Sequence, residues 1–101
     1  MSLPVTPDTV VVPRLDVRVR RVGGDFLVGM AEEAWSLSES GAFIWRQING
    51  RRTVREIAER LATEYDVDGT TALDDTSATI TELNGLELVR LGPEKPEESA
   101  G

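Results

Sequence analysis

Apolar and polar residues alternate in the first third of the chain. Between residues 15 and 19 every second residue is apolar and the others are charged, which is the period of a strand with one buried face. Gly23-Gly24 is a turn sequence that tolerates positive φ, and further apolar runs follow at residues 26–28 and 34–37. The pattern predicts three short antiparallel strands in sequence order.

Near residue 38 the spacing of apolar residues changes to the period of an α-helix. Ser38 can cap a first helix, which ends at Asn49-Gly50, a common pair of helix-stop residues. Thr53 and Glu56 match a capping box, so a second helix is predicted to begin there. Its apolar residues, spaced three and four apart over residues 54–65, form the clearest helical stripe in the chain.

A third helix with a thinner apolar stripe is predicted from near Thr71 to Asn84-Gly85, and residues 86–91 return as a short extended segment. A three-stranded antiparallel sheet followed by three helices is an α+β domain that resembles a winged helix-turn-helix. The predicted organisation is a flexible N-terminal arm over 1–13, one folded domain over 14–91 and a disordered acidic tail over 92–101.

The composition removes several kinds of chemistry. The 101 residues include no cysteine and no histidine, so disulfides, zinc fingers, thiolate nucleophiles and imidazole bases are excluded. Adjacent acidic pairs such as Asp74-Asp75 do not converge on one substrate, because neighbouring side chains diverge. Residues 66–69 begin like a calcium loop but lack the later ligands. We therefore expect a protein that is not an enzyme, with no metal site and no cofactor.

The net charge of −7 is concentrated in the C-terminal part, where residues 64–101 hold ten acidic residues against two basic ones. In a winged helix the third helix usually enters the major groove of DNA. The third helix predicted here contains three acidic residues and no basic residue over 71–86, and it would be repelled by phosphates. A winged-helix DNA-binding regulator is the alternative function, and nucleic acid is not expected as a partner.

No stretch of the sequence reaches the roughly 18 apolar residues of a membrane span. The first residues also lack the basic flank and apolar run of a secretory signal. We expect a cytoplasmic protein without a membrane partner.

A binding role remains. The third strand would lie at the edge of a short sheet, where unpaired N–H and C=O groups can accept an extended peptide. The small threonine and serine side chains beside Ile80 and Leu83 would leave a groove between this strand and the third helix. Both features favour a peptide-binding module.

Several short motifs support a family assignment. They are Arg20-Arg21-Val22-Gly23-Gly24, Trp35-Ser36-Leu37-Ser38, Ser40-Gly41-Ala42-Phe43-Ile44-Trp45, Gly50-Arg51-Arg52-Thr53-Val54-Arg55-Glu56-Ile57, the run from 61 to 65, Asp75, and Leu83-Asn84-Gly85-Leu86. With these motifs, residues 15–91 resemble the PqqD-like family of peptide chaperones, also called RiPP recognition elements. RiPPs are ribosomally synthesised, post-translationally modified peptides.

The resemblance implies a non-catalytic chaperone that binds the leader segment of a precursor peptide as an added strand. It also implies delivery of that peptide to a modifying enzyme, a radical SAM protein or a leader protease, in RiPP or pyrroloquinoline quinone-type biosynthesis. The peptide-binding residues implied are Ala34, Trp35, Ser36 and Leu37 on the strand, and Asp75, Thr76, Thr79, Ile80 and Leu83 on the helix. Homodimerisation through the free strand or the arms stays open.

Overall fold

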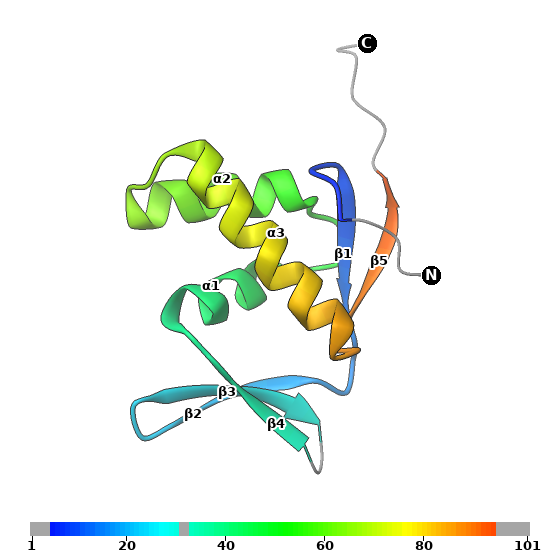
Figure 1. The fold of residues 1–101 in the computed structure, drawn as a ribbon. Helices are drawn as coiled ribbons and strands as arrows, with labels where there is room; N and C mark the ends of the chain where they lie inside the picture. Colours follow the sequence, from blue (N-terminus) through cyan, green and yellow to red (C-terminus); the bar gives the residue numbers. More distant parts are fainter. Residues whose placement is uncertain (1–4, 31–32, 95–101) are drawn as a thin grey trace.

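The computed structural model describes residues 5–30 and 33–94, and within them it contains two antiparallel sheets and three helices (Figure 1). The elements in chain order are β1 (Thr9–Pro13), β2 (Arg18–Val22), β3 (Asp25–Met30), β4 (Glu33–Leu37), α1 (Glu39–Gln47), α2 (Val54–Tyr65), α3 (Gly69–Gly85) and β5 (Val89–Glu94). The predicted α+β class, with a three-stranded sheet followed by three helices, is confirmed.

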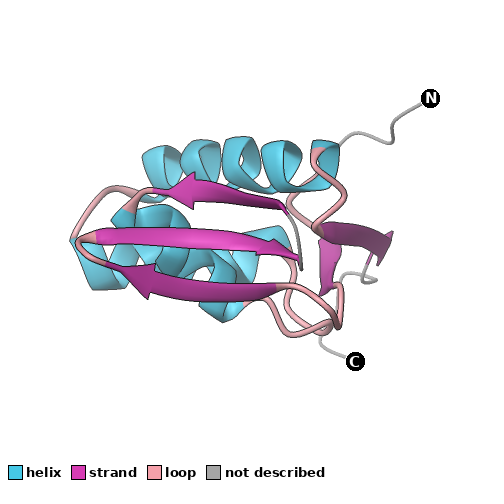
Figure 2. Cartoon of the chain, turned by 90° about the horizontal axis from the view of Figure 1, so that it is seen from below, coloured by secondary structure: helices cyan, strands magenta, loops and turns pink. Residues whose placement is uncertain are grey.

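The three-stranded sheet has the order β2-β3-β4, so β2 and β4 are its two edges. Gly23, with a φ of 63°, makes the tight turn between β2 and β3 that the sequence predicts. Seen from below, the three strands lie side by side, and α3 runs along the same side of the sheet as β4 (Figure 2). The C-terminal end of α3 descends toward β4 in Figure 1.

The first strand begins later than the alternating pattern predicts. Leu15 is 97% exposed and lies in a turn, and β2 starts at Arg18. The backbone explains the difference, because Val17 N–H donates to the Arg14 carbonyl and closes a turn there. Leu15 is thus a solvent-facing turn residue, and Val17 is the first residue of the alternating segment to be buried.

A second sheet, which the sequence pattern does not predict, joins the two ends of the domain. β1 pairs with β5 in antiparallel order, with Val11 opposite Leu91. Val11 is fully buried, so residues 9–13 are part of the folded domain and the prediction of a flexible arm over 1–13 is wrong for them. β5 likewise continues to Glu94, past the predicted domain end at 91, while the rest of the predicted tail lies outside the described residues.

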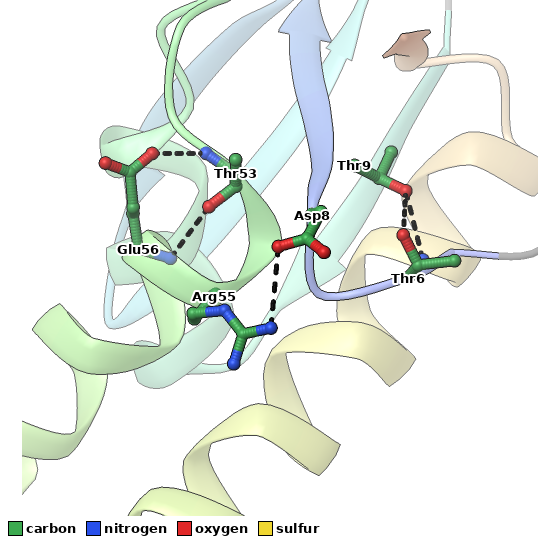
Figure 3. Close-up of polar contacts among 6 residues, drawn as sticks. All are labelled: Thr6, Asp8, Thr9, Thr53, Arg55 and Glu56. Atoms are coloured by element: carbon green, nitrogen blue, oxygen red, sulfur yellow. Dashed lines mark hydrogen bonds and ion pairs between the residues drawn. The ribbon is translucent and has the colours of Figure 1, made fainter. Parts of the chain in front are cut away.

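The residues before β1 are also attached to the helices. Asp8 Oδ1 lies 3.4 Å from Arg55 Nη2 on α2 (Figure 3). The backbone N–H of Arg55 also donates to the Pro7 carbonyl. Thr6 N–H donates to the Thr9 hydroxyl over 3.0 Å. Prolines precede and end β1 without interrupting it, which is why a proline-rich segment can still form a strand.

The helix caps agree with the sequence. Thr53 N–H donates to Glu56 Oε1 over 2.9 Å, and Glu56 N–H donates to Thr53 Oγ1 over 3.1 Å, which completes the capping box of α2 (Figure 3). Ser38 Oγ accepts from Gly41 N–H at the start of α1. α3 begins at Gly69, two residues before the predicted start, because Asp68 accepts from Thr71 N–H and is its N-cap.

One hydrophobic core lies between the helices and the sheets. Its fully buried side chains include Val28 of the large sheet, Ile44 of α1, Ile57 of α2, Ile80 of α3 and Leu88 before β5. No helix in the described part of the chain is long and apolar enough to cross a membrane.

Candidate functional site

The outer side of β4 is an open sheet edge, because β4 pairs only with β3 among the described strands. Met30 pairs with Glu33, and only two residues separate them. In a two-residue hairpin the residues that flank the turn exchange hydrogen bonds, and bonded pairs alternate from there. Trp35 therefore bonds to β3, while the N–H and C=O groups of Ala34 and Ser36 point to the open edge.

The pairing of β3 with β2, on its other side, leads to the same assignment of bonded and open groups in β4. Val22 and Asp25 flank the two-residue turn at Gly23-Gly24, so the hydrogen-bonding groups of Asp25 point to β2. Because these groups alternate in direction along β3, the N–H and C=O groups of its odd-numbered residues bond to β2 and those of its even-numbered residues bond to β4. Trp35 is opposite an even-numbered residue, Val28. The two hairpins thus agree on which groups of β4 are open.

The side chains of β4 divide between the two faces of the sheet. Ala34 and Ser36 are exposed, opposite Gly29 and Leu27 on the face away from the helices. Trp35 and Leu37 are partly buried and pack against the core. The structure therefore places all four predicted strand residues at one edge, and the tryptophan is partly core, as its place in the pattern predicts.

The predicted residues of α3 do not lie together at the surface. Asp75 is exposed and Thr79 is partly buried, but Thr76 and Ile80 are fully buried and Leu83 is 2% exposed. These three side chains are core residues, which corrects the expectation that they line an open groove. Most of the thin apolar stripe of the sequence belongs to the buried face of α3, because this helix packs against α2 and β5. Ile80 and Leu83 are therefore not available to line a groove, while Leu73 of the same stripe is only partly buried.

Thr76 carries an unusual feature for a core residue. Its hydroxyl oxygen is buried and has no hydrogen-bond partner in the structure. Burying an unpaired hydroxyl costs free energy, so this group destabilises the folded state. At zero exposure it does not contact a ligand at the surface in this conformation.

The exposed surface of α3 is acidic. Asp74, Asp75 and Glu82 are all exposed, and the helix contains no basic residue. Hydrogen bonds from the N–H and hydroxyl of Thr71 hold the pKa of the Asp68 carboxyl, at the start of the helix, below its ordinary value. A helix with this charge is unsuited to duplex DNA, whose recognition depends on cationic side chains. Among the described residues no group of acidic side chains could hold a metal ion.

The sequence alone does not determine which N–H and C=O groups of β4 are open, although the spacing that sets them is present in it. The two-residue spacing between β3 and β4 sets the register once the strand ends are known. Strand ends are the least certain part of a sequence-based prediction, and a shift by one residue exchanges the open and bonded positions. The structure supplies the missing register.

The fold and its open edge define a class: small α+β domains in which a three-helix layer covers one face of a short antiparallel sheet. The family model described as coenzyme PQQ synthesis protein D (PqqD) matches residues 19–89. The chain belongs to this family, and the resemblance seen in the sequence is confirmed. No curated protein matches the chain.

Solved structures similar to this chain include the following three. One is the solution NMR structure of the PqqD truncation of Methylobacterium extorquens PqqCD, which is described as a functional, stand-alone RiPP recognition element. It has a TM-score of 0.74 and 20% sequence identity to this chain, and the match covers 85% of this chain and 94% of that chain. Lasso peptide synthetase B1 complexed with the leader peptide has a TM-score of 0.67 and 22% identity, covering 80% and 98%. TbiB1 in complex with the TbiA(beta) leader peptide has a TM-score of 0.67 and 20% identity, covering 83% and 99%. At these identities the likeness shows the fold.

Proposed function

We propose that this protein binds the leader segment of a ribosomally made precursor peptide as an additional strand on β4. The observation that carries the proposal is the open edge, where Ala34 and Ser36 direct their N–H and C=O groups to solvent. Main-chain hydrogen bonds to such an edge supply affinity for an extended peptide of almost any sequence. Two similar structures with leader peptides, lasso peptide synthetase B1 and TbiB1, support the same role.

Specificity would come from side chains beside the edge. A strand added to β4 directs alternate side chains toward the helix layer, where Trp35, Leu37 and Thr79 are partly exposed. Apolar leader side chains on this face would contact Trp35 and Leu37, while the exposed Asp75 favours a basic leader residue near α3. Thr76, Ile80 and Leu83 support this surface from the core.

The protein would not catalyse the modification itself. It carries no histidine or cysteine, and its acidic pairs do not converge. It would deliver the precursor to a modifying enzyme, a radical SAM protein or a leader protease. The fusion of PqqD to a second protein in Methylobacterium extorquens PqqCD is consistent with a role beside another protein.

The test uses the leader of the precursor peptide encoded nearest to this gene, labelled for fluorescence anisotropy, and three proteins. Ser36→Pro removes the open N–H, Ser36→Ala keeps it, and the wild type is the reference. Each main-chain hydrogen bond contributes about 0.5–1.5 kcal/mol net, so Ser36→Pro should bind at least two- to tenfold more weakly. Ser36→Ala should bind about as well as the wild type. Circular dichroism checks that both variants are folded.

Residue-resolved amide exchange tests which N–H groups of β4 are open at the edge. In the free protein the amides of Ala34 and Ser36 should exchange rapidly, while those of Trp35 and Leu37 are already protected by β3. Added leader should slow exchange at Ala34 and Ser36 selectively. Strand addition is wrong if folded Ser36→Pro binds normally, or if the leader protects residues 51–55 and leaves 33–38 unchanged. A salt-sensitive gel shift with random-sequence duplex DNA would instead support the alternative function, a winged-helix DNA-binding regulator.

A further inference from the structure

The opposite edge of the sheet gathers positive charge. Arg18, Arg20 and Arg21 of β2 are exposed, and Arg46 of α1 is exposed beside them. Arg18 and Arg20 are opposite Gly29 and Leu27, so they lie on the face away from the helices. Arg21 is opposite Phe26 on the helix-facing side. The edge therefore carries guanidinium groups on both faces of the sheet.

One aromatic ring holds two of these arginines together. The guanidinium carbons of Arg21 and Arg46 each lie 5.5 Å from the centre of the Phe26 ring. Cation–π attraction to the ring offsets part of the repulsion between two like charges. Val19 and Trp45 line the same hollow beside β2. The arrangement is a basic rim around a partly apolar floor.

Among the described residues, none of these four arginines has a carboxylate within ion-pair distance. The two ion pairs found there join Arg14 to Asp16 and Arg55 to Asp8. The chain has a net charge of −7, and the acidic residue that shares a hollow with Arg18 and Arg20, Asp16, is paired with Arg14. An unpaired cluster of this kind attracts negatively charged partners and speeds their association.

β2 is also an open strand edge. Val22 and Asp25 flank the turn at Gly23-Gly24, so by alternation the N–H and C=O groups of Val19 and Arg21 point away from β3. An extended polypeptide can pair with these groups, and its side chains would alternate between the two faces. Because arginines border both faces, consecutive acidic residues would each meet a guanidinium group.

We propose that the β2 edge binds an acidic, extended segment of a second protein. The identification of that protein as the modifying enzyme rests on the function proposed above. β2 and β4 are separated by β3, so both edges can be occupied at once. The leader on one edge and the enzyme on the other would hold the precursor close to the active site that modifies it.

The structure favours a protein over a nucleic acid as occupant. The open N–H and C=O groups of β2 match another strand. Single-stranded nucleic acids are bound through aromatic rings on which bases stack. Of the two rings at this hollow, Phe26 is covered by Arg21 and Arg46, and Trp45 is partly buried against the core. The acidic surface of α3 adds repulsion for a duplex.

The probe is an acetylated, amidated peptide of eight glutamates, titrated into the ¹⁵N-labelled full chain at low ionic strength and followed by NMR. Shifts are expected at residues 18–22 and at Arg46, with β4 unchanged. Arg18→Glu with Arg20→Glu should weaken binding by about tenfold or more, since attraction becomes repulsion at two positions. Both side chains are exposed, so the fold should be retained. Arg51→Glu with Arg60→Glu changes the net charge equally at exposed sites away from β2 and should bind as the wild type does.

Four results would overturn the inference: no shifts at β2, equal loss of binding in the control pair, tighter binding of an oligothymidylate of eight nucleotides at the same residues, or a dimer in sedimentation that only the β2 variant abolishes. The leader is titrated separately into the same variants. If the wild-type chain does not bind the leader but the glutamate peptide still shifts the β2 signals, the proposed function alone is contradicted. If the wild-type chain binds the leader but the glutamate peptide causes no shifts at β2, this inference alone is contradicted.

Discussion

Replacing Thr76 by valine should stabilise the protein. Threonine and valine have nearly the same shape and are both β-branched, so the change exchanges a hydroxyl for a methyl group without altering the packing volume. The Thr76 hydroxyl is fully buried and has no partner. An unpaired buried polar group costs about 1–3 kcal/mol, and the added methyl contributes about 0.8 kcal/mol through burial. Allowing for incomplete relaxation, Thr76→Val should raise the free energy of unfolding by about 1–2 kcal/mol.

For a domain of this size each kcal/mol raises Tm by about 4–8 °C. Urea denaturation followed by far-UV circular dichroism measures the free energy directly, and calorimetry measures Tm. Thr79→Val is the matched control on the same helix, and it should change stability little because Thr79 is only partly buried. If Thr76→Val is neutral or destabilising, the hydroxyl is satisfied in solution and the reasoning fails. Leader binding should be unchanged, since the hydroxyl does not reach the surface.

Three further changes should follow from the structure. Thr53→Ala removes the hydroxyl that accepts from Glu56 N–H and should cost about 1 kcal/mol in urea denaturation. Val11→Ala removes two buried methyl groups and should cost about 2 kcal/mol, because β1 belongs to the core. The pKa of Asp68 is lowered by the hydrogen bonds from Thr71, so its contribution to stability is present above the unfolded pKa and is lost as pH falls through the folded pKa. Asp68→Asn should flatten the decline of stability below about pH 4, measured as Tm against pH.

The Thr53 and Val11 changes each have a control within the chain. Thr63→Ala, at an exposed position of α2, should change stability little compared with Thr53→Ala. Val22→Ala, at a side chain that is 53% exposed, should cost much less than Val11→Ala. Equal effects in either pair would show that the cap or the β1 packing does not contribute as argued. If Asp68→Asn leaves the dependence of Tm on pH unchanged, a group other than Asp68 causes the loss of stability at low pH.

The three helices, the β2–β3 turn and the family could be predicted from the sequence because their signals are local. The capping box joins Thr53 to Glu56 within one helical turn, and Gly23-Gly24 lies between two apolar runs. Such interactions depend on residues a few positions apart, so they are present in any window of the chain. The strand residues of the candidate site followed from the same signals together with the family motifs.

Only the tertiary structure decided the remaining features, because each depends on residues that are distant in the chain. Val11 is buried by pairing with Leu91, and no local pattern marks a proline-flanked segment as half of that sheet. The stripe of α3 containing Ile80 would suit either a groove or a core, and packing against α2 and β5 made it core. The basic edge likewise requires α1 to bring Arg46 onto the ring of Phe26. A linear pattern states which side chains are apolar or charged, but the neighbours that cover or leave them open are chosen by the packing of the whole chain.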